Sequence, residues 1–526
     1  MGVILDVKYG TDNELEKYKC RNCIKGHPGN VFKGVHYNET FSAAPDMISS
    51  RLIGVICMLE GMVRICWDVR TAYLNAECAP SERVPLRYPP EFRHYRIDKD
   101  GNKHELFGLL LKNLYGHPAA ARNWGKTRDA WIMEYFNTDS FTCIMCPSDE
   151  CVFKITGPID ESFIMIIHTD DVDAYTTSMC FGLRIARAFE DKWGIVMCNP
   201  EKMLGVKRRR WTEGDTEHLE LSMPGYITDV YNKWVSTMKT TSEPSTSFPP
   251  GKQNSFHEWR DKLSFKRDID PVEVREVQER GFLSVTGSLL WGGRNVFPDT
   301  SFGINQLCKI MSRPTEENWD QSMHLLRWMY KNKDRGIKFS TKGNKTLSCF
   351  YDSSFNPDPK DSKCHYGWVI YLGGGPIAWG SHKHQHVSPA VMHAEYCTVR
   401  PAADCIIWIR KLLTELGMTK YLPKPRPGCP DQPGPVPIYG DNDMATSLIV
   451  ENRHTPANRM ILREFHLVQE YYRQGFILPK RVNTKRNPSD LLTKSATEPD
   501  FRGLIHQLTG YRAMDESTLH LPLGEP

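Results

Sequence analysis

Two short apolar runs, each followed by carboxylates, restrict the possible fold of this chain more than any other sequence feature. Residues 63–67 lead into Asp68, and residues 163–168 lead into the adjacent pair Asp170 and Asp171. Apolar runs of this length are typical of buried β-strands. Adjacent carboxylates at the end of such a strand repel each other unless a cation lies between them, although a surface turn that caps the strand would use the same residues. We therefore weigh a divalent-metal site against an exposed turn.

The composition is that of a large folded protein. A chain of 526 residues with 40% hydrophobic residues predicts about three or four domains. Its net charge of +4 is modest but does not exclude a nucleic-acid partner, because local patches matter more than the sum. There is no run of 18 apolar residues and no signal peptide, so we expect an intracellular protein without a membrane span. Its 16 cysteines are then expected to be reduced.

Proline-rich segments and the periodicity of apolar residues divide the rest of the chain into predicted connectors, helices and strands. Residues 236–254 are rich in Ser, Thr and Pro and predict a connector, and residues 419–437 hold seven prolines and predict a loop. Apolar residues at helical spacing predict helices over 303–311 and 319–329. The last region predicts strands at 347–351 and 436–439, a hairpin of 366–372 with 377–380 around Gly373, Gly374 and Gly375, and a helix over 392–416.

The strand-end pattern of acids therefore occurs twice. In the last region, Asp352 ends the strand of residues 347–351, and Asp441 follows the strand of residues 436–439. Phosphoryl transfer without a covalent intermediate uses two divalent metals about 4 Å apart. Mg²⁺ prefers hard oxygen ligands, so carboxylates at strand ends are its expected sequence signature.

Motifs surround both sets of acids. In the first 320 residues they are KYKCRNCIKG (17–26), GVHYNETFSAAP (34–45), WDVRTAYLNAE (67–77), LLKNLYGHPAAARNW (110–124), IIHTDDV (166–172), MLGVKRRR (203–210), VTGSLLW (285–291) and FPDTSFGINQLCKIMSRPTEENW (297–319). Later motifs are CFYDSSF with Asp352, MHAEYCTV with Glu395, IYGDNDMA with Asp441 and NPSDLLTK with Asp490. In their order, over about residues 15–510, they resemble the reverse transcriptase and ribonuclease H part of copia-type (Pseudoviridae) LTR-retrotransposon Pol polyproteins.

The resemblance implies an α/β (α+β) architecture. A right-hand polymerase of fingers, palm and thumb would be followed by a connection and a ribonuclease H-like mixed five-stranded sheet with helices. The implied boundaries are fingers and palm at 1–235, a helical thumb and connection at 236–340, ribonuclease H at 341–510 and a tail at 511–526. Without protease, zinc-knuckle or integrase motifs, the chain is expected to be the C-terminal polymerase part of a polyprotein.

The resemblance also implies the chemistry. Asp68, Asp170 and Asp171 would hold Mg²⁺, or Mn²⁺, for nucleotide addition, and Asp352, Glu395, Asp441 and Asp490 would hold it to cut RNA in an RNA–DNA hybrid. The partners would be an RNA template, a DNA primer, deoxynucleoside triphosphates and the hybrid, in the cytoplasm within a virus-like particle or in the nucleus. Nothing in the sequence specifies an oligomeric state.

Substrate contacts follow from the same motifs. Tyr73 would be an aromatic gate that clashes with a ribose 2′-hydroxyl, or else a core aromatic. Lys19 and Arg21 would contact the triphosphate, or else be ordinary surface charges. Arg122, with Trp124, would support the template or nucleotide pocket.

Several positions depart from the family pattern. His168 and Thr169 replace Tyr and Val before the paired aspartates, and Ala119 replaces a glutamine that contacts the nucleotide. Further departures are the missing Arg before Pro298 and Asp299, and Met460 and Leu462 in place of His and Asp. The alternatives are a degenerate or domesticated element product that binds nucleic acid without polymerising, and a chain with ribonuclease H activity alone.

Three other patterns carry two interpretations each. The basic run 207–210, followed by Trp211, is either a nucleic-acid patch or a solvated hairpin strand. His382, His384 and His386 alternate and could share a strand face, but no carboxylate partner is evident for a metal. The Cys-x-x-Cys pairs Cys20/Cys23 and Cys143/Cys146 lack a second pair at zinc-finger spacing, so reduced thiols are favoured.

Overall fold

The computed structural model describes residues 2–9, 15–27, 29–199, 202–203, 205–238, 243–247, 269–355, 361–451, 462–512 and 519–520. The chain forms two compact units. The first comprises Met1–Ser49 and Met62–Pro200, and the second comprises Ser50–Gly61 and Glu201–Pro526. The expected domain boundaries at residues 235, 340 and 510 stay a prediction. None of the helices in the described ranges is long and apolar enough to cross a membrane.

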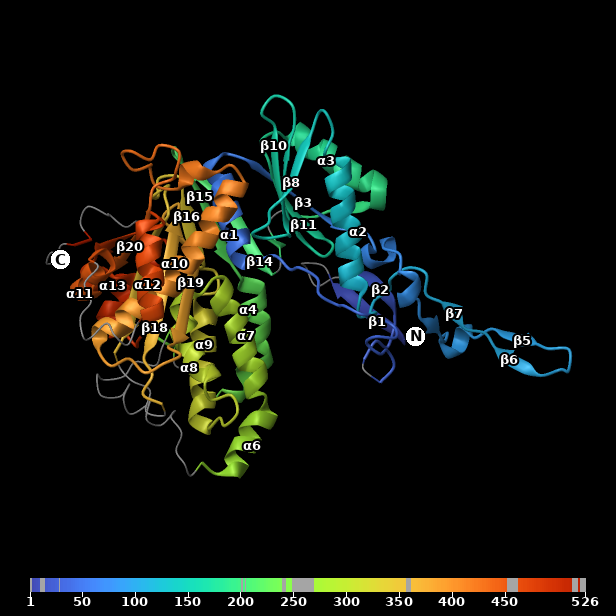
Figure 1. The fold of residues 1–526 in the computed structure, drawn as a ribbon. Coiled ribbons are helices and arrows are strands. Elements are labelled where there is room, and N and C mark those ends of the chain that lie inside the picture. Colours follow the sequence, from blue (N-terminus) through green and yellow to red (C-terminus); the bar gives the residue numbers. More distant parts are fainter. Residues whose placement is uncertain are drawn as a thin grey trace. The chain divides into compact units, whose positions relative to one another are not determined.

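A six-stranded antiparallel sheet organises the first unit (Figure 1). Its strand order is β12-β3-β11-β10-β9-β8. The bounds are β3 (Val63–Val69), β8 (Thr142–Met145), β9 (Val152–Thr156), β10 (Ser162–His168), β11 (Asp171–Thr176) and β12 (Ile195–Met197). The two apolar runs that precede the acids therefore form strands as predicted, in β3 and β10.

Two helices cover one face of this sheet, α2 (Ala120–Tyr135) and α3 (Met179–Trp193). Trp67 of β3 is fully buried there and stacks on Phe163 of β10. Because side chains alternate along a strand, Asp68 lies on the opposite face from Trp67. The helices thus leave the acidic face of the sheet uncovered by this core.

Smaller hairpins accompany the sheet in the first unit. They are β1 (Gly2–Tyr9) with β2 (Leu15–Cys23), β4 (Pro85–Leu86) with β7 (Gly108–Leu109), and β5 (Tyr95–Ile97) with β6 (Lys103–Glu105). The β1–β2 hairpin carries several exposed apolar side chains, such as Leu5 and Tyr18. This segment contains two of the predicted substrate contacts, Lys19 and Arg21.

A buried ion pair ties β3 to β11. Arg64 Nε lies 2.6 Å from Asp173 Oδ1, and the Asp173 side chain is fully buried. We expect Arg64→Ala to destabilise the protein by about 3–5 kcal/mol, since it leaves a buried carboxylate without its cation. Urea denaturation measures this.

The matched control is Arg187→Ala, which removes an exposed pair with Asp191 on α3 and should cost less than about 0.5 kcal/mol. The double variant Arg64→Met/Asp173→Leu should recover most of the lost stability, because both charges are then removed. Equal losses of unfolding free energy in Arg64→Ala and Arg187→Ala would contradict a stabilising role for the buried Arg64–Asp173 pair.

The second unit contains a four-stranded sheet and a group of helices. The sheet has the order β13-β14-β15-β16. Its bounds are β13 (Lys202–Met203), β14 (Val206–Glu213), β15 (Thr216–Ser222) and β16 (Ile337–Ser340), and the helices are α4 (Pro224–Trp234), α6 (Pro271–Arg280), α7 (Phe282–Asn295), α8 (Ser301–Cys308) and α9 (Glu316–Lys331). The predicted helix over 303–311 ends earlier, at Cys308, because residues 309–312 form turns. The predicted connector 236–254 lies outside the described residues over 239–242 and 248–254.

A mixed five-stranded sheet with helices completes the second unit, as predicted (Figure 1). The order is β19-β18-β17-β20-β21, with β17–β20 and β20–β21 parallel and the other pairs antiparallel. The bounds are β17 (Ser348–Ser354), β18 (His365–Leu372), β19 (Gly375–Lys383), β20 (Val436–Gly440), β21 (Ile477–Arg481), α10 (Val391–Glu415), α11 (Asp443–Val450), α12 (Leu462–Arg473) and α13 (Glu498–Leu508). Gly373 and Gly374 both have positive φ and form the two-residue turn of the predicted hairpin.

The helix α1 (Met47–Leu59) contributes residues 50–59 to the second unit. Arg51 is buried there, and its Nε donates to the Ile377 carbonyl at 2.7 Å. The same guanidinium donates to the Arg294 carbonyl at 3.1 Å and stacks over Trp379 at 4.3 Å. A helix from the N-terminal part of the sequence is therefore built into the C-terminal unit.

Candidate active sites

The second unit brings three of its four predicted acids into one cluster. Asp352 lies in β17, Asp441 follows β20, and Asp490 lies in the short 3-10 helix η9 (Pro488–Leu492). One carboxylate oxygen of each lies within 4.8 Å of the others. In the parallel β17–β20 pair, Phe350 aligns with Tyr439, so both aspartates stand two residues further along at the same level. Parallel strands thus deliver two carboxylates to one edge of the sheet.

Glu395 lies beside this cluster, in the first turns of α10. Its Oε1 accepts a hydrogen bond from the Ser353 backbone N–H at 3.2 Å. Its Oε2 is buried and has no hydrogen-bond donor. Burial, and then the charges of Asp352 and Asp441, raise the pKa of Glu395 well above its usual range. Glu395 therefore lies beside the cluster but is not one of the three residues, Asp352, Asp441 and Asp490, whose carboxylate oxygens lie within 4.8 Å of one another.

Burial, followed by mutual repulsion, disfavours the charged form of the acids in this cluster. Burial and then Asp352 raise the pKa of both Asp490 and Asp441. The ammonium of Lys494 lies 3.0 Å from Asp490 Oδ2 and 3.8 Å from Asp352 Oδ2, which offsets part of this repulsion. Asp490 Oδ1 is buried without a hydrogen-bond donor. Crowded hard oxygen ligands with an unpaired buried oxygen fit a divalent cation such as Mg²⁺.

Three neighbours hold these acids in place, and the sequence interpretation did not single them out. Asn487 is fully buried, and its Nδ2 donates to the Tyr351 carbonyl at 2.9 Å, which ties η9 to β17. The Thr493 hydroxyl donates to Asp352. Thr493 and Lys494 close the motif that contains Asp490, and the four-residue spacing of Lys494 from Asp490 was an available signal.

The first unit places its three predicted acids at one end of adjacent strands. Asp171 is directly opposite Asp68 in the β11–β3 pair and opposite His168 in the β10–β11 pair. Asp170 and Thr169 form the two-residue turn between β10 and β11, and Thr169 takes φ 59°. All three acids are half-buried. The strand-end arrangement matches the predicted one, and their role in catalysis stays a prediction.

Helix α2 supports this turn. Trp124 is buried, and its Nε1 donates to the Thr169 carbonyl at 2.7 Å. Arg128 donates to the same carbonyl at 3.3 Å. Arg122 instead lies 3.0 Å from Glu39, whose side chain is largely exposed. Trp124 therefore positions the acidic turn, whereas Arg122 is held by a surface ion pair.

Two tyrosines lie near the acidic turn. The rings of Tyr73 and Tyr115 pack edge to face at 5.3 Å, and the Arg21 guanidinium lies 5.7 Å from the Tyr115 ring. Burial and then the Asp170 charge raise the pKa of Tyr73. Tyr73 and Arg21 thus lie near the acidic turn. Tyr73 is half-buried, which is intermediate between an exposed substrate contact and a core aromatic residue. The side chain of Lys19 lies outside the described residues.

The carboxyl group of Asp171 has a raised pKa. Burial, followed by the charges of Asp170 and Asp68, raises its pKa from 3.8 to about 6. Between pH 4 and 6 the folded protein then binds more protons at this site than the unfolded chain, so stability falls as pH rises through this window. After screening by solvent we expect a loss of about 1–2 kcal/mol. Thermal melts in metal-free buffer at pH 4 to 7 measure it.

The difference between wild type and Asp171→Asn isolates this carboxyl group from the other buried acids. Asp171→Asn should lose less stability than wild type over the same window. Mg²⁺ should raise the wild-type melting temperature above pH 6 and affect the variant less. Parallel pH curves for the two proteins would contradict the shifted pKa.

The structure describes several of the positions that depart from the family pattern. Ala119 is fully buried at the start of α2. His168 and Thr169 keep the hairpin geometry of the acidic turn. Asp299 is buried and accepts a hydrogen bond from Trp328 Nε1 at 2.7 Å. The further departures at Met460 and at the side chain of Leu462 lie outside the described residues.

The basic run 207–210 is largely engaged within the protein. Arg208 is buried and donates to Ser50, Arg209 lies 3.2 Å from Glu220, and Arg210 pairs with Glu217. Arg209 also stacks over Trp211 at 4.3 Å. These pairings favour the hairpin-strand interpretation over a nucleic-acid patch.

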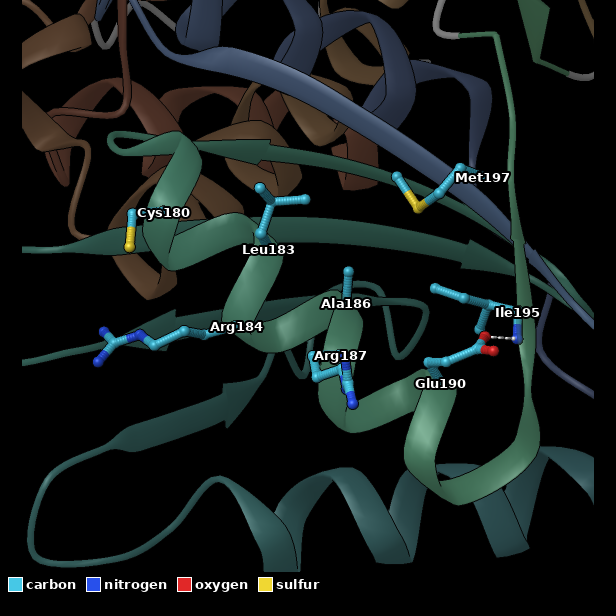
Figure 2. Close-up of a pocket in the computed structure, with 8 residues that line it drawn as sticks. All are labelled: Cys180, Leu183, Arg184, Ala186, Arg187, Glu190, Ile195 and Met197. Atoms are coloured by element: carbon cyan, nitrogen blue, oxygen red, sulfur yellow. Dashed lines mark hydrogen bonds between the residues drawn. The ribbon is translucent and has the colours of Figure 1, made fainter.

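One cavity of the first unit is an apolar groove away from the acids. It has a volume of about 940 Å³ and runs along α3 and β12, with Leu183 and Met197 facing it (Figure 2). Ile195 and Met197 line it, while Val196 between them pairs with Asp68. The groove therefore lies on the helix-covered face of the sheet, opposite to the Asp68 side chain.

No family model matches the chain. It is 28% identical over 511 residues to the retrovirus-related Pol polyprotein from transposon RE1 of Arabidopsis thaliana, and 26% identical over 509 residues to that from transposon RE2 of the same plant. It is 23% identical over 517 residues to the Pol polyprotein from transposon TNT 1-94 of Nicotiana tabacum. Each match covers 96% of this chain and 31–35% of the relative, so the chain spans about a third of these curated relatives.

Solved ribonuclease H structures align with part of the chain. LC11-RNase H1 from compost covers 28% of the chain and 93% of its own length, at 12% identity and a TM-score of 0.22. RNase H1 from Halobacterium salinarum covers 28% and 94%, at 16% identity and a TM-score of 0.20. With TM-scores this low, the description of the fold rests on the strand order alone.

The fold and the acids define a mixed α/β protein with two sets of neighbouring carboxylates, one in each unit. Its homologues over 96% of the chain, at 23–28% identity, are retrovirus-related Pol polyproteins from copia-type transposons. The relationship predicted from the sequence motifs is thereby confirmed.

Proposed function

We propose that this chain is an RNA-directed DNA polymerase with ribonuclease H activity from a copia-type retrotransposon. The observation that carries the proposal is the pair of carboxylate sets, one in each unit, in a homologue of Pol polyproteins. Under this proposal the first unit corresponds to fingers and palm, and helices of the second unit to thumb and connection.

The five-stranded sheet supports RNA-strand hydrolysis. Asp352, Asp441 and Asp490, with Glu395 beside them, would hold Mg²⁺, which supplies activation of the attacking water and neutralisation of the leaving oxygen. Asn487 and Thr493 keep the carboxylates aimed at one point through their hydrogen bonds. Lys494 limits the repulsion among them before a hybrid binds.

The six-stranded sheet supports nucleotide addition. Asp68, Asp170 and Asp171 would hold Mg²⁺ or Mn²⁺ beside the primer 3′-hydroxyl. Tyr73 would exclude a ribose 2′-hydroxyl, and Arg21 with Lys19 would contact the triphosphate of the incoming deoxynucleotide. Trp124 holds the turn that carries Asp170. Arg122, which the structure pairs with Glu39, would act only after leaving that partner.

One assay separates the possible activities. The purified chain receives Mg²⁺, an RNA template with a DNA primer and labelled deoxynucleotides, and a preformed RNA–DNA hybrid in a parallel reaction. Primer extension together with hybrid cleavage supports the full proposal. Hybrid cleavage without primer extension would indicate a chain with ribonuclease H activity alone. Hybrid binding without either activity would indicate a degenerate or domesticated element product.

A further inference from the structure

The side chain of Lys494 lies against the carboxylate cluster of the second unit. Its Nζ lies 3.0 Å from Asp490 Oδ2 and 3.8 Å from Asp352 Oδ2. These two aspartates and Asp441 are the residues whose carboxylate oxygens lie within 4.8 Å of one another. A lysine ammonium carries one positive charge and three N–H donors. Lys494 therefore brings a cation of the chain itself to the acids that would hold a metal.

The charge of Lys494 acts on the whole cluster. Burial and neighbouring acids raise the pKa of the Glu395, Asp441 and Asp490 carboxyl groups. The ammonium acts in the opposite direction on each of the three, so it offsets part of the rise. Burial alone would lower the pKa of Lys494, but the charges of Asp352 and Asp490 outweigh it and raise that pKa above its usual range. The ammonium thus stays protonated beside the acids.

The backbone at Lys494 is anchored, whereas its side chain reaches solvent. The Lys494 N–H donates to the Asp490 carbonyl at 3.2 Å, so the two side chains lie one helical turn apart on the same face. Leu492 and Thr493, which precede it, are buried. The Lys494 side chain is 38% exposed, and its four-carbon stem is flexible. The ammonium can therefore move from the acids into water while the backbone stays in place.

We propose that the ammonium of Lys494 competes with a divalent cation for Asp352, Asp441 and Asp490, and so sets the metal concentration at which this site fills. The inference rests on the metal site of the ribonuclease H activity proposed above. Two cations that share the same carboxylate oxygens repel each other at close range. Removal of the lysine charge should therefore strengthen metal binding. A lysine that only held the ligands in place would have the opposite effect, because its loss would weaken metal binding.

Calorimetric titration of the full chain with MnCl₂ tests this competition, since Mn²⁺ takes the same hard oxygen ligands as Mg²⁺. The parent and all variants carry Asp170→Asn and Asp171→Asn, which removes metal binding by the acids of the first unit. Lys494→Gln removes the charge and keeps an N–H donor. We expect it to bind Mn²⁺ about tenfold more tightly than the parent, a usual size for coupling between two ligands. Its melting temperature should be lower without metal and should rise more on addition of Mn²⁺.

Matched variants separate competition from other effects of the charge. Lys494→Met, a second uncharged variant, should also bind Mn²⁺ more tightly, whereas Lys494→Arg keeps the charge and should bind it within about twofold of the parent. Lys485→Gln removes an exposed lysine from the 3-10 helix η8 (Thr484–Arg486) and should also stay within about twofold of the parent.

The same titrations show which part of the argument fails. Unchanged or weaker Mn²⁺ binding in Lys494→Gln and Lys494→Met, with binding intact in the parent, overturns the competition and leaves the metal site standing. An equal gain in Lys485→Gln also overturns it, because the effect is then one of net charge. If neither the parent nor the Lys494 variants bind Mn²⁺, the metal site itself is wrong, and the competition with it.

Discussion

Asp352→Asn is expected to lower the rate of hybrid cleavage by about a thousandfold while raising the melting temperature of the metal-free protein. The loss of rate follows because a central ligand is removed, which forfeits about 4 kcal/mol of transition-state stabilisation. The gain in stability follows because Asp352 is a source of the repulsion on Glu395, Asp441 and Asp490. An amide still accepts the hydrogen bond from Thr493. Cleavage of a labelled hybrid and thermal melts measure both effects.

The matched control is Asp443→Asn. Asp443 is largely exposed in the first turn of α11, two residues after Asp441, and pairs with Arg481. The same change of charge there should alter the cleavage rate less than about twofold. If Asp352→Asn cleaves the hybrid as fast as Asp443→Asn, the cluster is not the hydrolytic site. If it loses both activity and stability, the carboxylate is structural instead.

Asp170→Asn is expected to reduce primer extension by about a thousandfold and to leave hybrid cleavage within about twofold of wild type. Asp170 lies in the turn between β10 and β11, with Asp171 beside it and Asp68 on the adjacent strand. Its backbone carbonyl accepts from the Val69 N–H at 2.9 Å, and this bond does not need the carboxylate. The variant should therefore fold, and the loss is that of a metal ligand. Single-nucleotide incorporation rates measure it.

Asp160→Asn provides the control for this substitution. Asp160 is exposed between β9 and β10 and takes φ 56°, a conformation that asparagine also tolerates. It should extend primers at the wild-type rate. Loss of cleavage along with extension in Asp170→Asn would point to general damage. Wild-type extension in that variant would remove the first carboxylate set from the mechanism.

The strand-end acids were predictable because local patterns specify them. An apolar run followed by a carboxylate predicted β3, β10, β17 and β20, each of which the structure confirms. The mixed five-stranded sheet and the hairpin at Gly373 and Gly374 followed from turn residues and family motifs. Both signals lie within short windows of sequence.

The contacts that hold the acids were not predictable in the same way. The Asn487 side chain donates to a carbonyl 136 residues away, and the Thr493 hydroxyl donates to a carboxylate 141 residues away. No periodicity within a window encodes such pairs.

The placement of α1 means that the chain passes between the two units three times, at residues 49–50, 61–62 and 200–201. A fragment that starts at residue 201 therefore lacks one of its own helices. The side chains of Leu52, Ile53 and Ile56 are fully buried, and the acceptors of Arg51 would be left open. We therefore expect fragment complementation: a peptide of residues 47–61 supplied in trans should solubilise the fragment that starts at residue 201. The two units should not be separable by a single cut of the chain.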